Sequence, residues 1–219
     1  MSKQEIHTTL YVIRHGETVN AEEKRYKGTI DVPLSANGIA QMEMTAGHLE
    51  KMVMEKKPAT GLTAVYTSDL SRARQSADIL AGRFKLKPVV DESLRERHFG
   101  IWEGMSFDEI TGKYPHEFQA WKKNPLLSRP LDGESTDQVQ RRVIPAVEKI
   151  IQKNWNTHVA IVAHGGVNRV ILCHYLGIPL EHIFRIEQGN GALSIIVFSD
   201  DYPLVSLLNW TPTLVKSKE

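Results

Sequence analysis

The chain has 219 residues, of which 41% are hydrophobic and 24% are charged, a composition typical of a globular protein with a sizeable core. Its formal net charge is +1, so it lacks the strong positive charge of nucleic-acid-binding proteins. No run of residues approaches the roughly 18 apolar residues of a membrane span, and the N-terminus lacks the apolar core of a signal peptide. We therefore expect a cytoplasmic protein that binds neither nucleic acid nor membranes.

The first half of the chain alternates between strand and helix patterns. Residues 8–13 are rich in β-branched and aromatic side chains and predict a strand. Residues 62–67 predict a second strand and residues 87–90 a short third one. Between the first two strands, a helix is expected to begin after the capping residue Ser35 and to end near residues 56–58. Its core-facing residues recur at helical spacing: Ile39, Met42, Ala46, Leu49, Met52 and Val53.

The helix after residue 67 carries an arginine that local stability does not explain. Ser68 and Asp69 are expected to cap this helix. Arg72 lies in its first turn, off the buried stripe, where a cation opposes the helix dipole. Binding of an anion would explain Arg72, whereas the alternative is a surface arginine paired with Asp69 or Asp78. The buried stripe consists of Leu70, Ala73, Ala77, Leu80, Ala81 and Phe84.

The middle of the chain predicts a covering segment. Residues 106–124 contain two short helical pieces separated at Pro115, and the residues that follow, up to Gly133, are rich in proline and turn formers. A capping-box pattern at Ser135 then opens a longer helix. We interpret residues 100–134 as a cap-like insertion over one end of the protein.

The last third of the chain completes an α/β pattern. Residues 158–163 are apolar throughout, as in a strand covered on both faces, and they run into His164 and a further helix. Residues 192–198 and 204–209 predict two strands with a short connection, and hence an antiparallel pair at one edge of the sheet. The alternation predicts one α/β domain over residues 1–219, with a mostly parallel central sheet in a three-layer αβα arrangement.

Basic residues follow three of these strands at the point where each strand ends. Arg14 and His15 follow the first strand, Arg72 follows the second, and His164 follows the strand of residues 158–163. Parallel strands end at the same edge of a sheet, so these side chains can converge in one pocket. A phosphomonoester carries about two negative charges near neutral pH, and the planar fork of arginine matches phosphate oxygens. We therefore hypothesise a phosphate pocket in which His15 is a nucleophile.

The same segments resemble the signature of the histidine phosphatase superfamily, whose fold is phosphoglycerate mutase-like. The pattern is most similar to that of the α-ribazole and broad-specificity phosphatases of this family. The matching segments fall in the family's order and cover nearly the whole chain: Arg14-His15-Gly16-Glu17-Thr18, residues 28–35 with Gly38, residues 68–73, residues 94–96 with Gly100, Trp102 and Gly104, residues 133–135, and His164-Gly165-Gly166.

This resemblance implies a two-step reaction that needs no metal or other cofactor. His15 attacks phosphorus and forms a phosphohistidine, while Glu96 protonates the leaving oxygen and later takes a proton from the hydrolysing water. Arg14, Arg72 and His164, with Gly165 beside them, bind the substrate and stabilise the charge on the phosphate oxygens. The expected partner is a small phosphorylated metabolite.

Two details of the site stay open in the sequence. Glu103 is a second candidate acid, because spacing alone does not choose between it and Glu96. The family often has an asparagine three residues after the threonine, in contact with phosphate, and this position is Ala21 here, with Asn20 one residue earlier. Either the loop is rearranged so that Asn20 contributes, or the contact is missing, and we leave Asn20 out of the expected site.

Three functions are compatible with the pattern. Cofactor-dependent phosphoglycerate mutases share the pocket but carry a longer insertion, which shields the phosphoenzyme from water. Glu96 and His164 are only 68 positions apart, so a phosphatase is favoured. Non-catalytic binding of a phospho-ligand is the third reading, which the intact pocket disfavours. Phe118 and Trp121 are expected either to line the leaving-group side or to pack beneath the cap. The pattern names no substrate, and a homodimer is compatible with it.

Overall fold

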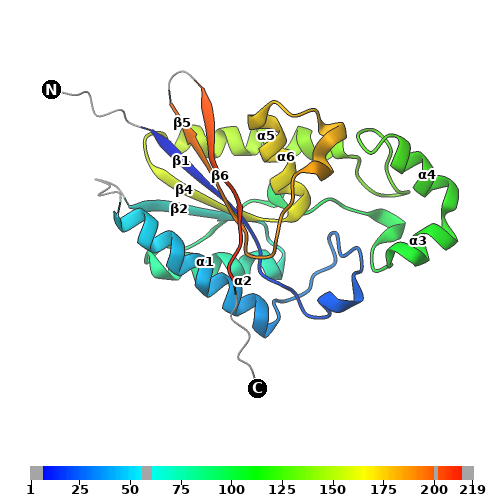
Figure 1. Cartoon of the computed structure of the whole chain (residues 1–219), viewed down its shortest axis with the longest axis horizontal. Helices are drawn as coiled ribbons and strands as arrows, with labels where there is room; N and C mark the ends of the chain where they lie inside the picture. The colour runs from blue at the N-terminus through cyan, green and yellow to red at the C-terminus, as the bar shows by residue number, and fades with distance from the viewer. Residues whose placement is uncertain (1–6, 56–60, 200–201, 214–219) are drawn as a thin grey trace.

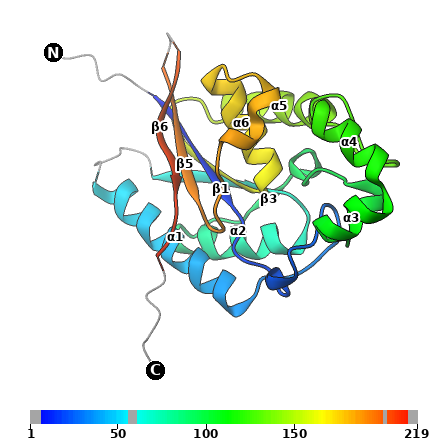
Figure 2. The same cartoon turned by 45° about the vertical axis from the view of Figure 1, so that its right-hand side comes forward.

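A six-stranded mixed sheet forms the centre of the protein, in the order β3-β2-β4-β1-β5-β6. The computed structural model describes residues 7–55, 61–199 and 202–213. Figures 1 and 2 show the sheet from two directions. Its strands are β1 (Thr8–Arg14), β2 (Leu62–Thr67), β3 (Val89–Val90), β4 (His158–Ala163), β5 (Leu193–Phe198) and β6 (Pro203–Trp210).

The pairing of the strands confirms the predicted fold class. β1, β2, β3 and β4 run parallel to one another, while β5 is antiparallel to both β1 and β6. The register places Arg14 opposite Ala163 at the ends of β1 and β4, and Thr67 of β2 opposite Val162. Three parallel strands therefore end at the same edge of the sheet, which is where open α/β sheets bind ligands.

Helices cover both faces of the sheet, as the three-layer prediction requires. In Figure 1, α1 and α2 lie on one side of the sheet and α5 and α6 on the other. Each side buries its own apolar cluster, and burial of each large aliphatic side chain contributes about 1.5–3 kcal/mol. The helices are α1 (Ala36–Glu55), α2 (Ser71–Arg83), α3 (Phe107–Lys113), α4 (Pro115–Lys123), α5 (Thr136–Lys153) and α6 (Gly165–Leu176). No helix of the described residues is long and apolar enough to cross a membrane.

The segment between β3 and α5 has a small core of its own. Trp102, Ile110 and Phe118 form this third cluster, which the half-buried Phe99 and Trp121 extend. The break between α3 and α4 falls at Pro115, as predicted, and the capping box at the start of α5 is present, with Ser135 accepting from the backbone N–H of Gln138 at 3.1 Å. In Figure 2, α3 and α4 lie on the side of the molecule opposite to β6.

Two local predictions on the α1 and α2 side are corrected, and a third is not tested. Ile39 is 47% exposed, because it lies in the first turn of α1, and the residues that pack on the sheet begin one turn later at Met42. Ser68 and Asp69 do not cap α2. The helix begins after Leu70, which makes no side-chain cap, because both polar residues have other partners. The predicted end of the first helix at residues 56–58 lies outside the described residues.

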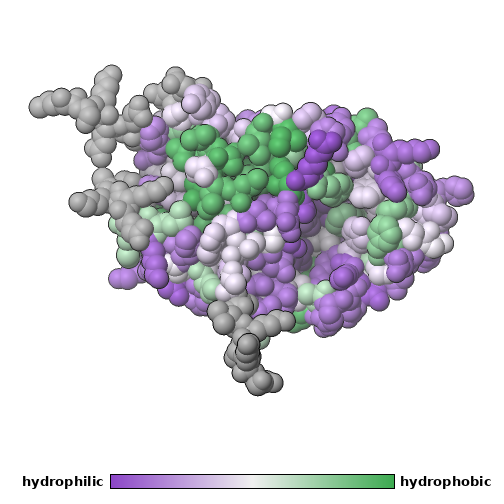
Figure 3. Space-filling model, viewed as in Figure 1, coloured by the Kyte–Doolittle hydropathy of each residue, from purple (hydrophilic) through white to green (hydrophobic). Residues whose placement is uncertain are grey.

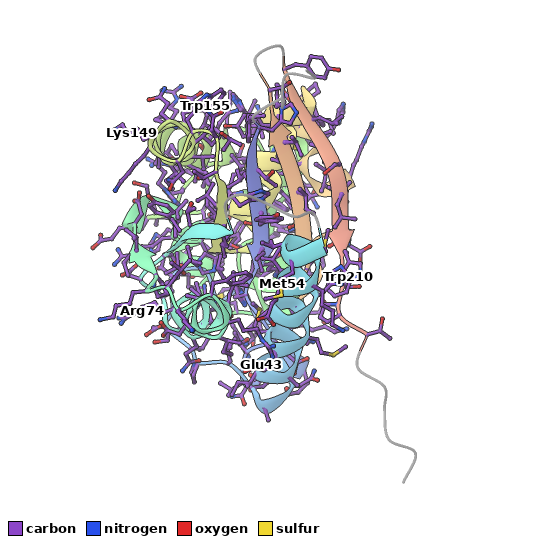
Figure 4. The ribbon with its side chains drawn as sticks, turned by 90° about the vertical axis from the view of Figure 1, so that its left-hand side faces the viewer. Glu43, Met54, Arg74, Lys149, Trp155 and Trp210 are labelled. Carbon is purple, nitrogen blue, oxygen red and sulfur yellow. The ribbon has the colours of Figure 1, made fainter. Side chains whose placement is uncertain are left out.

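The far end of β6 returns to α1. The ring of Trp210 stacks on His48, with ring centroids 4.0 Å apart, and Figure 4 shows Trp210 beside this helix. This contact ties the antiparallel edge of the sheet to the helix whose first turn supports the site.

Candidate active site

The ends of β1 and β4 bring two histidines together. The backbone N–H of His15 donates to the carbonyl of Ala163 at 3.0 Å, so the sheet ladder holds His15 beside the residue before His164. The two imidazole rings meet edge to face, with centroids 5.2 Å apart. Both rings are buried. The convergence that the sequence predicts for these two residues is therefore present.

A backbone contact fixes the loop that carries His15. The Ser35 hydroxyl accepts from the Gly38 N–H at 3.0 Å, and the Ser35 N–H donates to the Glu17 carbonyl at 2.9 Å. A Cβ atom on Gly16 would stand 2.3 Å from the carbonyl oxygen of Gly38. The loop after β1 and the first turn of α1 therefore touch backbone to backbone, at a distance that only glycine permits.

The protonation of His15 suits a nucleophile. Its Nδ1 atom lies 2.7 Å from the carbonyl oxygen of Gly16, and since a carbonyl can only accept, this contact assigns the proton to Nδ1. The lone pair of Nε2 is then free. Burial lowers the pKa of His15 well below 6.5, and the charges of Arg14 and Arg72 lower it further. The ring is therefore neutral at physiological pH.

Four of the predicted site residues line one cavity of about 320 Å³, which we call the phosphate cavity. Arg14, His15, Arg72 and Glu96 come from the end of β1, the start of α2 and the loop after β3. Other lining residues are Thr18, Ala21, Lys24, Arg25, Tyr26, Lys27, Gly28, Phe99 and Asn190.

Arg72 is not a surface residue with an acidic partner. It is 2% exposed, and its terminal nitrogens donate to the carbonyls of Ile30 at 2.8 Å and Gly28 at 2.6 Å. Asp69, one of the two alternative partners, forms an ion pair with Arg95 instead, and Asp78 is in no ion pair with Arg72 in the described part of the chain. Burial lowers the pKa of Arg72. Neutral carbonyls orient this guanidinium but leave its charge available for an anion.

Arg14 has the same character. One terminal nitrogen donates to the carbonyl of Gln188 at 2.6 Å, and its buried Nε has no hydrogen-bond partner among the described residues. Burial lowers the pKa of Arg14 to about 10. A partly buried cation with a buried, unused donor is well suited to an anionic ligand.

Glu96 is held by two backbone donors. Its carboxylate accepts from the N–H groups of Arg97 at 2.8 Å and Gly166 at 3.0 Å. No ion pair within 4.0 Å involves Glu96 in the part of the chain that the structure describes. From α5, Arg142 donates to the carbonyls of Arg95 and Glu96 and so fixes this loop. The carboxylate therefore reaches the cavity without a cation that would pin it.

Glu103, the other candidate acid, has a different task. Its carboxylate accepts from the N–H groups of Thr29 at 2.8 Å and Phe99 at 3.1 Å. It does not line the phosphate cavity. Glu103 instead shapes the loop at Gly28, whose carbonyl orients Arg72. The geometry therefore favours Glu96 as the acid.

His164 lies behind His15 and not on the cavity wall. Its Nε2 atom lies 2.7 Å from the hydroxyl of Ser68, and its Nδ1 is buried without a partner among the described residues. Burial lowers the pKa of His164 well below 6.5, and Arg72 lowers it further. Ser68 follows β2 directly, so the residue predicted as a helix cap orients this histidine instead.

A second cavity of about 210 Å³ adjoins the first, and we call it the leaving-group cavity. The two share Arg14, Tyr26, Glu96 and Phe99, so Glu96 lies between them. Trp121 lines this cavity, whereas Phe118 does not and is buried in the core of the cap. The other lining residues are Arg97, Thr136, Val139, Gly165, Gly166, Arg169, Val170, Ile183 and Phe184.

Comparison with known proteins identifies the family. The model of the histidine phosphatase superfamily (branch 1) matches residues 10–211. The chain belongs to the histidine phosphatase superfamily.

Its relatives agree with this assignment. The chain is 28% identical to phosphoserine phosphatase 1 of Hydrogenobacter thermophilus over 202 residues, which cover 92% of each chain. The solved structure of YhfR from Bacillus stearothermophilus matches with a TM-score of 0.81 and 33% identity, over 91% of this chain and 96% of that one. The α-ribazole phosphatase of Shigella flexneri matches in fold, with a TM-score of 0.81, 24% identity, and 95% and 100% coverage. The fold is thus phosphoglycerate mutase-like, as predicted.

The loop after Thr18 departs from the expected pattern of the histidine phosphatase superfamily in the position of its asparagine. Asn20 is exposed and does not line the phosphate cavity, whereas Ala21 does. Lys27 also lines it, and its ammonium group donates to the Thr18 hydroxyl and to the Val19 carbonyl. Burial and the nearby Arg72 lower the pKa of Lys27. Lys27 lies within a run of charges, and so the sequence pattern did not predict it as a site residue; its position directly before Gly28 was the available signal.

The described residues contain no group of three or more histidine, cysteine, aspartate or glutamate side chains that could hold a metal ion. The cations of the phosphate cavity are those of the protein itself: Arg14, Arg72, Lys27, Lys24 and Arg25.

Proposed function

We propose that this protein is a metal-independent phosphatase that hydrolyses a small phosphomonoester through a phosphohistidine at His15. Its membership of a phosphatase superfamily supports phosphoryl chemistry in general. One observation carries the specific proposal: a buried, neutral imidazole lines the same cavity as two guanidinium groups, those of Arg14 and Arg72, whose described partners are backbone carbonyls.

The first step transfers the phosphoryl group to His15. The Nε2 lone pair attacks phosphorus, the bond between phosphorus and the ester oxygen breaks, and the proton of a neutral Glu96 goes to the leaving oxygen. Glu96 suits this role because it lies between the two cavities. The Nδ1–H of His15 keeps its hydrogen bond to Gly16, which stabilises the positive charge that the ring gains.

The second step returns the enzyme to its starting state. Water attacks phosphorus, its proton goes to the Glu96 carboxylate, and the bond between phosphorus and Nε2 breaks with its electron pair returning to His15. Arg14 and Arg72 stabilise the charge on the phosphoryl oxygens in both steps. We assign His164 a supporting role through His15, whose ring it meets edge to face, because it does not line the cavity itself. Lys27 supplies a charged donor in the loop that lacks the asparagine amide.

Transfer of the phosphoryl group between positions, as in a phosphoglycerate mutase, is the main alternative. A mutase must keep water from its phosphohistidine. We treat residues 1–219 as a single domain, in which the cap-like residues 100–134 cover the site. The segment between Glu96 and His164 is too short to hold the longer insertion that shields the phosphoenzyme of the mutases, so water should reach the phosphohistidine. Hydrolysis is therefore favoured over transfer, and over binding without chemistry.

Covalent trapping tests the proposal. The protein is mixed with a ³²P-labelled phosphomonoester, quenched with alkali and digested. We expect label on the peptide that contains His15, stable to alkali and lost in acid, as is typical of phosphohistidine. His15→Ala should abolish the label and turnover, with losses of about 10⁴-fold or more. His116→Ala, at an exposed position on α4, is the matched control. Label that survives acid, or turnover that survives His15→Ala, would refute the mechanism.

Three further assignments accompany this proposal. A panel of phosphorylated metabolites that includes α-ribazole phosphate tests the α-ribazole phosphatase alternative, and 3-phosphoglycerate with 2,3-bisphosphoglycerate tests for isomerisation without phosphate release. Fractionation of cells tests the cytoplasmic location.

The homodimer can be tested by light scattering. The surface to alter is the side of β6, where Leu204 and Leu208 are exposed and where Figure 3 shows hydrophobic residues gathered.

A further inference from the structure

The leaving-group cavity carries more positive charge than the reaction at phosphorus uses. Three guanidinium groups line it, those of Arg14, Arg97 and Arg169, against the single carboxylate of Glu96. Arg14 also lines the phosphate cavity, so its charge serves the phosphoryl group. The charges of Arg97 and Arg169 are left on the side where the leaving group must lie.

Arg97 is committed to the protein itself. Its nitrogens donate to the Glu134 carbonyl at 2.7 Å and to the Thr136 hydroxyl at 3.2 Å. Its guanidinium also lies over the ring of Phe99, 5.5 Å from the centroid. The residue is buried, and we regard it as a wall of the cavity.

Arg169 has a fork without a partner. Its Nε donates to the carbonyl of Ile186 at 2.7 Å, which fixes the side chain, and this is the one hydrogen bond of its guanidinium to the described residues. The nearest acids acting on it are Glu96 and Glu187, and neither lies within 4.0 Å in the ion pairs of the described chain. Burial lowers its pKa. The guanidinium is held in place and is unpaired.

The position of Arg169 fits a group on the leaving side of the ester. A Cβ atom on Gly165 would lie 3.4 Å from both Arg14 Nε and an Arg169 terminal nitrogen. The two guanidinium groups therefore flank Gly165, one in the phosphate cavity and one beyond it. Aromatic and aliphatic side chains line much of the remaining wall, with Tyr26 and Phe184 among them, so the charge of Arg169 faces a mainly apolar cavity.

We propose that Arg169 binds a carboxylate on the leaving group, and hence that the substrate is the phosphomonoester of a small hydroxy acid. A carboxylate is planar and takes two parallel hydrogen bonds from a guanidinium fork. This assignment rests on the proposed function, since it concerns the leaving side of the same reaction. It identifies a specificity-determining residue that lies outside the phosphate cavity.

A matched pair of esters tests the proposal. 3-Phosphoglycerate and sn-glycerol 3-phosphate have the same three-carbon skeleton and differ in that a carboxylate replaces a hydroxymethyl group. We expect kcat/KM of the unaltered protein to be at least tenfold higher for 3-phosphoglycerate. Arg169→Gln should lower kcat/KM for this ester about 10- to 100-fold, mainly through KM, because a hydrogen-bonded charge is lost. For glycerol 3-phosphate the change in kcat/KM should stay within about twofold. For 3-phosphoglycerate, kcat/KM of Arg169→Lys should lie between the values of the unaltered protein and of Arg169→Gln.

Controls separate the binding role from a structural one. Arg74 is exposed and points away from the body of the protein in Figure 4, so Arg74→Gln should leave kcat/KM unchanged for both esters. Equal losses on both esters in Arg169→Gln, or no preference in the unaltered protein, would overturn the proposal. Glycerol 1,3-bisphosphate keeps the 2-hydroxyl and carries a phosphorylated hydroxymethyl group in place of the carboxylate. A larger loss of kcat/KM for this ester than for 3-phosphoglycerate in Arg169→Gln would overturn the assignment to a carboxylate.

Equilibrium binding keeps this test independent of turnover. If no ester of the metabolite panel is hydrolysed and no label appears on His15, the proposed function fails, but titration calorimetry with 3-phosphoglycerate and sn-glycerol 3-phosphate still decides the role of Arg169. A loss of affinity in Arg169→Gln that is confined to 3-phosphoglycerate supports the carboxylate site, and an equal loss for both esters overturns it.

Discussion

The two cavities that meet at Glu96 differ in how they are built. The phosphate cavity takes Arg14 and His15 from the end of a sheet strand and Arg72 from the first turn of the helix after the next strand. The leaving-group cavity takes its walls from α4, α5, α6 and the 3-10 segment Leu180–Arg185, with aromatic rings on several sides. The cationic groups and the histidine of the phosphate cavity thus lie at or shortly after the ends of sheet strands, whereas most walls of the leaving-group cavity come from helices and the 3-10 segment outside the sheet. Substitutions in the first cavity should therefore affect all substrates, and substitutions in the second only some.

Loss of the acid at the boundary should have the largest effect. Glu96→Gln keeps the shape but cannot exchange a proton, so kcat for alkyl phosphates should fall about 10²- to 10⁴-fold. With p-nitrophenyl phosphate the leaving group needs no proton, so the first step should survive. Stopped-flow absorbance should then show a burst of nitrophenol followed by slow turnover.

Glu103→Gln is the control for this prediction. Glu103 shapes the Gly28 loop and does not line the phosphate cavity, so its loss should be smaller and should show no burst. A burst in Glu103→Gln, or its absence in Glu96→Gln, would reverse the assignment of the acid.

Arg72→Lys should have the next largest effect. Lysine keeps the charge but loses the fork that Gly28 and Ile30 orient. We expect kcat/KM to fall about 10²- to 10³-fold for every ester, because stabilisation of the transition state is lost. Steady-state kinetics measure this, with Arg83→Lys at a surface pair on the same helix as control. A loss confined to some esters would contradict the division between the cavities.

Lys27→Met should have a moderate effect and should also change the pH profile. Lys27 is one of the charges that lower the pKa of His15, so its removal should raise that pKa. The reaction needs neutral His15, and activity is lost as the pH falls through this pKa, so the acidic limb of kcat/KM should move to higher pH. We expect a loss of about tenfold near neutral pH. An acidic limb that moves downward would contradict this, and the exposed Lys51→Met is the control.

Phe184→Ala should have the smallest effect and should depend on the substrate. Phe184 is 58% exposed and packs against Trp121 with ring centroids 5.6 Å apart. Removal of this contact should raise KM about threefold for esters that fill the cavity, in line with the strength of an aromatic pair, and leave p-nitrophenyl phosphate unchanged. Phe107→Ala, an exposed ring on α3 outside the cavity, should change neither. An equal loss of activity for every ester, p-nitrophenyl phosphate included, would contradict a role of Phe184 in binding the leaving group alone.

The same division explains what the sequence could predict. β1 and β4 end where their apolar runs end, so the sequence alone could place His15 and His164 at one edge of the sheet. Arg72 was recognisable because it opposes the helix dipole. These signals are local, and the sheet then brings the residues together.

The remaining residues depend on tertiary contacts that no local pattern carries. A serine and an aspartate before a helix are typical caps, yet Ser68 orients His164 and Asp69 binds Arg95. The position of Arg169 in the sequence pattern of α6 is that of an ordinary solvent-facing residue. It lines a cavity because the segment Leu180–Arg185, which the sequence did not predict, folds against α6.

The backbone contact between Gly16 and Gly38 has a consequence for the transfer of this site to other proteins. A Cβ on Gly38 would stand 2.0 Å from the Glu17 carbonyl, so a side chain there would push the nucleophile loop away from the sheet. In a scan of all substitutions, position 38 should tolerate change as poorly as a residue that touches the ligand. A designer who grafts the Arg14-His15-Gly16 turn onto another sheet must therefore graft the first turn of α1 with it.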